Sequence, residues 1–100
     1  MVKWSVPARQ DLRSIYNYIA KDSKVYATNV SQEIVEKSEM LNKFPAIGRI
    51  VPEINNPNIR ELFIYSYRLI YKISPWGIEV LVVIHGKRDF SSSDLEKIRK

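Results

Sequence analysis

The sequence predicts a single α+β domain, a small antiparallel β-sheet with an N-terminal helical hairpin packed on one face. Two observations lead to this prediction. Two segments near the N-terminus place apolar residues at helical spacing, and the second half of the chain holds three strand-like segments separated by short turns. The 100 residues, 45% of them hydrophobic, suffice for one core, so we expect one domain over residues 1–100 with the element order β-α-α-β-β-β-α.

The first half of the chain reads as a short strand followed by the helical hairpin. Residues 2–6 alternate between apolar and polar types and predict a strand, and Pro7 suits the first turn of a helix. That helix should end at the Lys-Asp-Ser segment 21–23, whose aspartate or serine can cap a second helix. We expect the second helix to continue to Pro45, with Phe44 on its apolar side.

The second half of the chain reads as a loop, three strands and a short helix. Residues 45–58 combine three prolines and three asparagines with four large apolar residues, so we expect a long loop that lies on the core. Strands are predicted at 59–65, 67–73 and 78–86, the last being a central strand covered on both faces. Capping serines and an acid near residue 91, with basic residues at the chain end, predict a C-terminal helix on the same sheet face.

The hairpin made by the first two of these strands carries the charged residues of interest. A two-residue turn at Tyr65–Ser66 places Glu61 opposite Ile70 and Phe63 opposite Arg68. Because side chains alternate along a strand, each strand then has one apolar and one charged face. The apolar face holds Leu62, Ile64 and Leu69, and the charged face holds Glu61, Arg68 and Lys72.

The charged face permits two interpretations. The guanidinium groups of Arg68 and Arg88 can each bind a phosphate, Glu61 can serve as a general base on a ribose 2′-hydroxyl, and His85 as a general acid. His85 would join this face together with Glu79, with which it shares strand parity. Alternatively, Glu61 and Arg68 form a cross-strand ion pair and His85 merely ends a strand. Spacing alone favours the ion pair.

Further binding candidates, and some exclusions, come from composition. Basic side chains contact phosphates and tyrosine rings stack on bases, so the binding candidates are Arg60, Lys72, Lys87 and Tyr67. The net charge of +5 favours a polyanion or an acidic protein partner. With one histidine, no cysteine and no glycine-rich phosphate loop, we expect neither a metal nor a cofactor. The lack of cysteine suits the cytoplasm, and no apolar run is long enough for a membrane span.

Four segments together resemble the RelE/ParE superfamily, the toxins of type II toxin–antitoxin modules. The resemblance spans about Trp4 to Phe90 and lies in the order and spacing of these segments. It implies a compact antiparallel sheet with an N-terminal helical hairpin. It also implies a cognate antitoxin, encoded beside the toxin, that wraps it within a higher-order complex. The segments are DLRSIYNYI, LNKFPAIGRIVPE, IRELFIYSYRLIYKI and VVIHGKRDF.

The superfamily contains two kinds of toxin, and this sequence carries features of both. RelE-like members cut mRNA on the ribosome, and the resemblance matches Arg68 and Arg88 to their phosphate-binding arginines. Glu61, Arg68 and His85 are similar to the glutamate–arginine–histidine set of YoeB-type nucleases. RelE enzymes, however, carry basic residues where this chain has Glu61 and Phe63, and a tyrosine that this C-terminal segment lacks.

The residues of the motifs resemble those of ParE-like members more than those of RelE-like members. ParE-like members, also called plasmid-stabilisation proteins, inhibit DNA gyrase and are not nucleases. The resemblance therefore predicts a growth-inhibiting toxin and favours gyrase as its target. A ribosome-dependent mRNA endoribonuclease is the first alternative, so the sequence leaves open whether the chain is an enzyme. An inactive relative that only binds its partner is the second.

Overall fold

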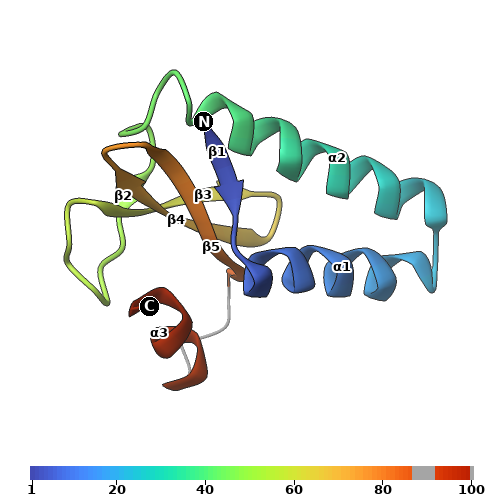
Figure 1. Cartoon of the computed structure of the whole chain (residues 1–100). Helices are drawn as coiled ribbons and strands as arrows, with labels where there is room; N and C mark the ends of the chain where they lie inside the picture. The colour runs from blue at the N-terminus through green and yellow to red at the C-terminus, as the bar shows by residue number, and fades with distance from the viewer. Residues whose placement is uncertain (87–91, 100) are drawn as a thin grey trace.

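The fold is an α+β domain built on one five-stranded sheet, as the computed structural model shows for residues 1–86 and 92–99 (Figure 1). The strand order is β1-β5-β4-β3-β2, and all neighbouring strands are antiparallel except β1 and β5. The predicted fold class is confirmed, with one strand more than expected. The elements are β1 (Val2–Trp4), α1 (Val6–Ala20), α2 (Lys24–Met40), β2 (Arg49–Ile50), β3 (Ile59–Ile64), β4 (Tyr67–Ser74), β5 (Gly77–His85) and α3 (Ser92–Arg99).

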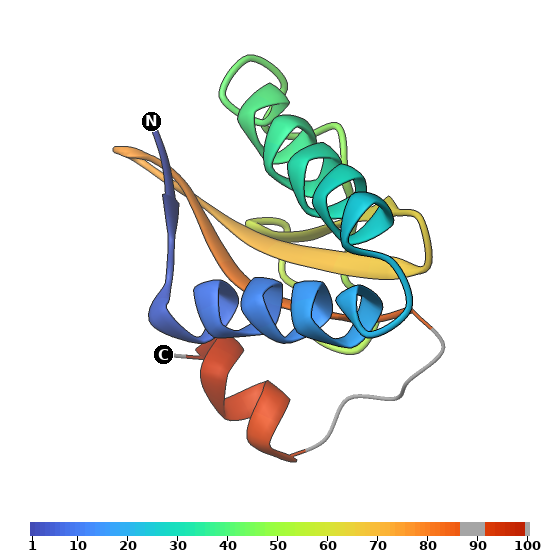
Figure 2. The same ribbon diagram turned by 90° about the vertical axis from the view of Figure 1, so that its right-hand side faces the viewer.

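The two N-terminal helices form the predicted hairpin, and serines cap both of them. The hydroxyl of Ser5 accepts a hydrogen bond from the Ala8 amide at 3.1 Å, and that of Ser23 accepts one from the Tyr26 amide at 3.1 Å. Each hydroxyl satisfies a backbone donor that the first helical turn leaves unpaired. Figure 2 shows the two helices joined by a tight connection at the end of the molecule where β3 turns into β4.

The second helix is shorter than predicted. α2 ends at Met40, and the amides of Leu41 and Asn42 bond to carbonyl groups only three residues back. These tighter bonds change the helical period, so Phe44 no longer falls on the buried side and its surface is 55% exposed. The expectation that the helix reaches Pro45 with Phe44 in the core is therefore wrong.

Apolar side chains cover both faces of the sheet. On one face, α1 and α2 pack through Ile15, Val30 and Ile34 against the central strands. On the other, Ile98 of α3 packs in a second cluster with Val82 and other residues. The expectation that all helices lie on one face is therefore wrong, because β5 is apolar on both sides and both must be covered. We call these the hairpin face and the α3 face.

The register of the β3–β4 hairpin agrees with the prediction in every pair. Phe63 lies opposite Arg68 and Glu61 lies opposite Ile70, across a two-residue turn in which Tyr65 adopts a φ of 54°. Glu61, Arg68 and Lys72 therefore share the α3 face. The predicted apolar residues Leu62, Ile64 and Leu69 share the hairpin face, where they meet the helices.

A β-bulge separates the two ends of β5. Ile70 pairs with Val82 and Tyr71 pairs with Val80, so Leu81 is an extra residue. One extra residue reverses the side-chain alternation beyond it. Glu79 consequently lies on the α3 face, opposite Lys72, whereas His85 lies on the hairpin face, opposite Tyr67. The expectation that Glu79 and His85 share one face is wrong for this reason.

The long loop at 45–58 lies on the sheet, as predicted, but it also contains the short edge strand β2. Val51 is fully buried and belongs to the α3-face cluster. Gly48 lets the loop approach β3 closely, because a Cβ atom there would lie 2.5 Å from the carbonyl oxygen of Glu61. The hydroxyl of Tyr71 accepts a hydrogen bond from the Gly48 amide at 3.0 Å and donates one to the Pro45 carbonyl at 2.6 Å.

Replacing Tyr71 with phenylalanine tests how firmly this loop is attached. Tyr71→Phe keeps the ring in the core and removes the hydroxyl that joins two backbone groups of the loop. Because the Gly48 amide is then left without its partner, we expect a loss of about 1–3 kcal/mol in the free energy of unfolding. Urea denaturation measures the loss. Tyr16→Phe, on the half-exposed side of α1, is the control and should be neutral.

Candidate functional site

The charged residues of the α3 face form one connected network around Glu61. Arg68 donates from its Nε to Glu61 Oε1 at 2.7 Å, and its Nη2 bonds to the same oxygen. The second carboxylate oxygen of Glu61 accepts from Arg49 Nε. Sheet register explains these contacts, since Arg49 lies directly opposite Glu61 and Arg68 lies diagonally across from it.

A second carboxylate joins the network from the loop that follows β2. Glu53 accepts hydrogen bonds from Arg68 Nη1 at 3.2 Å and from Nη2 at 3.1 Å. Arg68 therefore binds two carboxylates. Its Nε and Nη2 contact Glu61, and its Nη1 and Nη2 contact Glu53. We call these four residues the arginine–carboxylate cluster: Arg49, Glu53, Glu61 and Arg68.

Burial differs sharply within the arginine–carboxylate cluster. The side chain of Glu61 is completely buried and that of Arg68 is 7% exposed, whereas the Arg49 side chain is 61% exposed. Burial by itself lowers the pKa of Arg68, but the hydrogen bonds that it donates to Glu53 and Glu61 outweigh burial and raise the pKa. The hydrogen bond from Arg68 also holds the pKa of Glu53 below its ordinary value. The two residues are thus stabilised in their charged forms.

The outer part of the cluster is a small aromatic and cationic surface. Phe63 is 52% exposed, and its ring centre lies 5.4 Å from the Arg49 guanidinium carbon and 6.0 Å from that of Arg68. Both distances are within the range of a cation–π contact. A partner can therefore reach Arg49 and Glu53 of the cluster and the neighbouring Phe63, whereas Glu61 is out of reach behind them.

The structure does not bring all the predicted catalytic residues together. Glu61 and Arg68 are in direct contact, as the ion-pair interpretation predicted. His85 lies on the hairpin face, where its ring makes an edge-on contact with Tyr67, with 5.7 Å between ring centres. Arg88 lies outside the described residues, as does the binding candidate Lys87. A single surface that joins Glu61, Arg68 and His85 is thus absent from the described part of the chain.

The other predicted binding residues also divide between the two faces. Lys72 is exposed on the α3 face, beside Glu79. Arg60 is on the hairpin side and holds the loop, donating from Nε to the Pro57 carbonyl and from Nη1 to the Gly48 carbonyl, both at 3.0 Å. Tyr67 is half-buried against the helices. Arg60 therefore has a structural role in this arrangement.

Two members of the cluster, Arg49 and Glu53, were not among the residues predicted from sequence. Both belong to the segment GRIVPE, one of the motifs that carries the superfamily resemblance. The motif was thus a usable signal. In the structure, the glycine of this motif permits a close approach to β3. Its arginine donates a hydrogen bond to Glu61, and its glutamate accepts one from Arg68.

The lowered pKa of Glu53 predicts a pH-dependent contribution to stability. Since the folded-state pKa lies below the unfolded one, the contribution is present above the unfolded pKa and disappears as pH falls through the folded pKa. Glu53→Gln should therefore destabilise the fold at neutral pH, by about 1 kcal/mol or less because solvent screens the pair. The difference should vanish in acid. Urea denaturation across pH tests this, with the exposed Glu36→Gln as control; a difference that persists in acid contradicts it.

Most of the chain matches a known protein family. The sequence pattern of the family described as "ParE toxin of type II toxin-antitoxin system, parDE" matches residues 2–90, which is most of the chain. The chain belongs to the ParE toxin family. The family match includes the whole arginine–carboxylate cluster and both strands of the β3–β4 hairpin. The predicted membership of the RelE/ParE superfamily is confirmed.

A solved structure agrees with this ParE toxin fold. A chain from the chromosomal ParDE toxin–antitoxin system of P. aeruginosa superposes with a TM-score of 0.70 and 24% sequence identity, covering 84% of this chain and 92% of that one. At this identity the likeness concerns the fold. Curated protein sequences give no significant match. In residues 1–86 and 92–99, no helix has the length and apolar character needed to cross a bilayer.

Proposed function

We propose that this chain is the toxin of a type II toxin–antitoxin pair and that it arrests growth by binding DNA gyrase, without cutting RNA. Membership of the ParE toxin family supports the first part. The observation that supports the second part is the paired state of Arg68, which contacts both Glu61 and Glu53 in the interior of the α3 face.

A nuclease of the predicted kind needs an arginine that binds the scissile phosphate and a base that can reach the 2′-hydroxyl. In this chain the Arg68 guanidinium already faces two carboxylates, which would repel an approaching phosphate. The Glu61 side chain has no exposed surface through which to take a proton. His85, the candidate acid, is on the opposite face of the sheet. These positions favour a structural role for the cluster and a toxin that acts by binding.

A cognate antitoxin is the second partner in this proposal. The toxin carries a net charge of +5, so an acidic segment of an antitoxin would be attracted to it. Such a segment can order on binding and cover a large area of a small domain. We place both proteins in the cytoplasm, where they would assemble into a higher-order complex.

The decisive experiment compares the natural protein with a variant that lacks the buried charges, Glu61→Leu/Arg68→Met. Purified, antitoxin-free samples of both are tested for inhibition of gyrase supercoiling and for cleavage of ribosome-bound mRNA, and both are induced in cells. We expect growth arrest and gyrase inhibition by both proteins and no cut mRNA. Cuts at the ribosomal A-site that disappear in the variant would replace this proposal with a RelE-like nuclease. Natural protein that fails to arrest growth would indicate the inactive relative.

A further inference from the structure

A groove on the hairpin face is separate from the arginine–carboxylate cluster. It has a volume of about 480 Å³ and lies at the end of the molecule where the α1–α2 connection approaches the β3–β4 turn (Figure 2). Four tyrosines from α1, α2, β4 and the β3–β4 turn line it, together with an apolar floor. We call it the tyrosine groove, and its aromatic lining consists of Tyr18, Tyr26, Tyr65, Tyr67 and His85.

The tyrosine groove combines an apolar floor with accessible aromatic walls. Ile15, Val30 and Val83 form the floor, and each of them belongs to the main core. Tyr18 is 71% exposed and Tyr26 is 52% exposed, although both are large aromatic residues in a groove. Monomeric proteins seldom expose aromatic clusters of this kind, and those that do use them to contact other molecules. Volumes of this size suit a few side chains of a bound segment.

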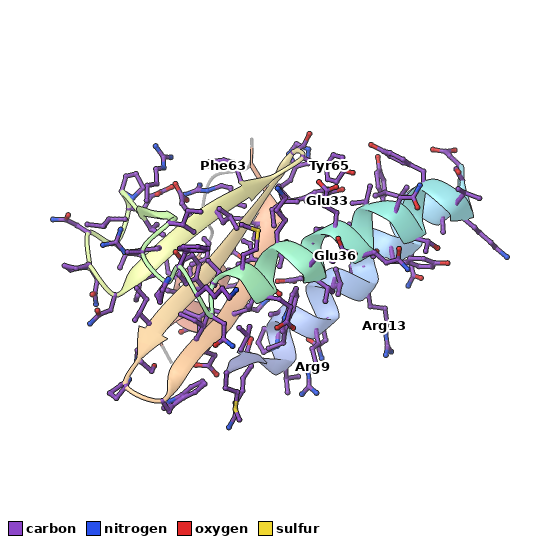
Figure 3. All side chains as sticks on the ribbon, turned by 90° about the horizontal axis from the view of Figure 1, so that it is seen from above. Arg9, Arg13, Glu33, Glu36, Phe63 and Tyr65 are labelled. Atoms are coloured by element: carbon purple, nitrogen blue, oxygen red, sulfur yellow. The ribbon has the colours of Figure 1, made fainter. Side chains whose placement is uncertain are left out.

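The described lining of the groove is acidic, opposite in sign to the net charge of the protein as a whole. None of its lining residues in the described chain is lysine or arginine, whereas Asp11 contributes a carboxylate that also accepts from the Val83 amide at 2.9 Å. Glu33 adds a second carboxylate beside Tyr65, where burial and this carboxylate raise the pKa of the Tyr65 hydroxyl. Figure 3 shows Glu33 beside Tyr65, with Arg9 and Arg13 pointing away from the turn.

Tyrosine rings and carboxylates together attract cations. The negative face of an aromatic ring binds ammonium and guanidinium groups, and it does so more strongly when water is excluded. The protein's own Lys21 shows this at the outer edge, where its Nζ lies 6.0 Å from the centre of the Tyr18 ring. Burial and the neighbouring hydroxyls of Tyr18 and Tyr26 raise the pKa of Tyr67, so its ring stays neutral at physiological pH.

We propose that the tyrosine groove binds a segment of a partner protein in which an arginine is flanked by apolar side chains. The apolar side chains would rest on the floor formed by the core, and the guanidinium would lie among the tyrosine rings near Asp11 and Glu33. Arginine fits better than lysine, because its planar group stacks on aromatic rings while it bonds to carboxylates at its edge. The proposal does not depend on the proposed inhibition of gyrase, because it is argued only from the lining and the charge of the groove.

The test uses the full chain and two synthetic peptides. One is a short helical peptide with a single arginine among leucines, and the other carries citrulline, the neutral isostere of arginine, in its place. Calorimetry and amide shifts of the labelled protein measure binding. We expect the arginine peptide to shift groove residues and to bind at least about 10-fold more tightly than the citrulline peptide. Equal affinity of the two peptides would overturn the proposal.

Matched variants locate the binding. Tyr18→Ala/Tyr26→Ala removes two exposed rings from helices, where alanine is well tolerated, so the variant should fold. It should bind the arginine peptide about 10-fold or more weakly. Phe63→Ala removes a similarly exposed ring from the opposite face and should bind normally. Unchanged affinity in the tyrosine variant would refute the site, and so would spermidine binding there as tightly as the peptide, which would make it a small-cation site.

Discussion

Replacing Leu69 with aspartate is expected to unfold the protein. Leu69 has no exposed surface and sits on β4, the middle strand, between Leu62 on β3 and Val83 on β5. Leu69→Asp loses the burial of a large apolar side chain and places a carboxylate among the apolar side chains of the hairpin face. We expect a loss of more than about 5 kcal/mol, which equals or exceeds the whole stability of many small domains.

Circular dichroism, amide dispersion and urea denaturation would measure this loss. The matched control is Phe63→Asp, which makes the same kind of change on the exposed side of the same hairpin. Its carboxylate would lie near the guanidinium groups of Arg49 and Arg68, so we expect a cost of about 1 kcal/mol or less. If the two variants unfold alike, the assignment of the hairpin's faces is wrong.

The hairpin was predictable because two independent features of its sequence agree. Its apolar and charged residues alternate, and a two-residue turn at Tyr65–Ser66 is the simplest connection that keeps the alternation in register. The contact between Glu61 and Arg68 follows from that register alone. Sequence reasoning works here because every step depends on neighbours within a few residues.

The position of His85 was not predictable by the same reasoning. The bulge at Leu81 lies inside the apolar run from Val80 to Ile84, where residues on both sides are buried. In such a run the pattern is the same whether or not one residue is extra, so nothing marks the change of face. The sequence therefore could not decide whether His85 joins Glu61, and the position of His85 is one of the differences between the nuclease arrangement and the observed one.

The remaining members of the cluster depend on a loop whose sequence has no period. Arg49 and Glu53 reach Glu61 and Arg68 because the short strand β2 pairs with β3 and because Gly48 allows the close approach. A two-residue strand is too short to leave an alternating pattern. Only the motif GRIVPE distinguished these residues, and a motif names positions without giving their contacts.

Replacing Arg68 with alanine should cost about 3–5 kcal/mol of unfolding free energy. The change leaves the carboxylate of Glu61 fully buried, with the half-solvated Arg49 as its remaining ion-pair partner in the cluster. Removing one member of a buried ion pair is this costly because the other charge loses its compensation. Urea denaturation at neutral pH would measure the loss. A growth assay of this variant alone would not separate the loss of stability from a loss of activity.

The double variant Glu61→Leu/Arg68→Met separates stability from function. Removing both charges eliminates the desolvation penalty, and two apolar side chains of similar volume fill the space, so we expect stability within about 2 kcal/mol of the natural protein. Arg49 and Glu53 are exposed enough to be solvated without their partners. If Arg68→Ala is much less stable than the natural protein but the double variant is stable and arrests growth, the cluster has a structural role. If the double variant is equally stable but harmless, the two charges are needed for activity and the structural role of the cluster is not its only one.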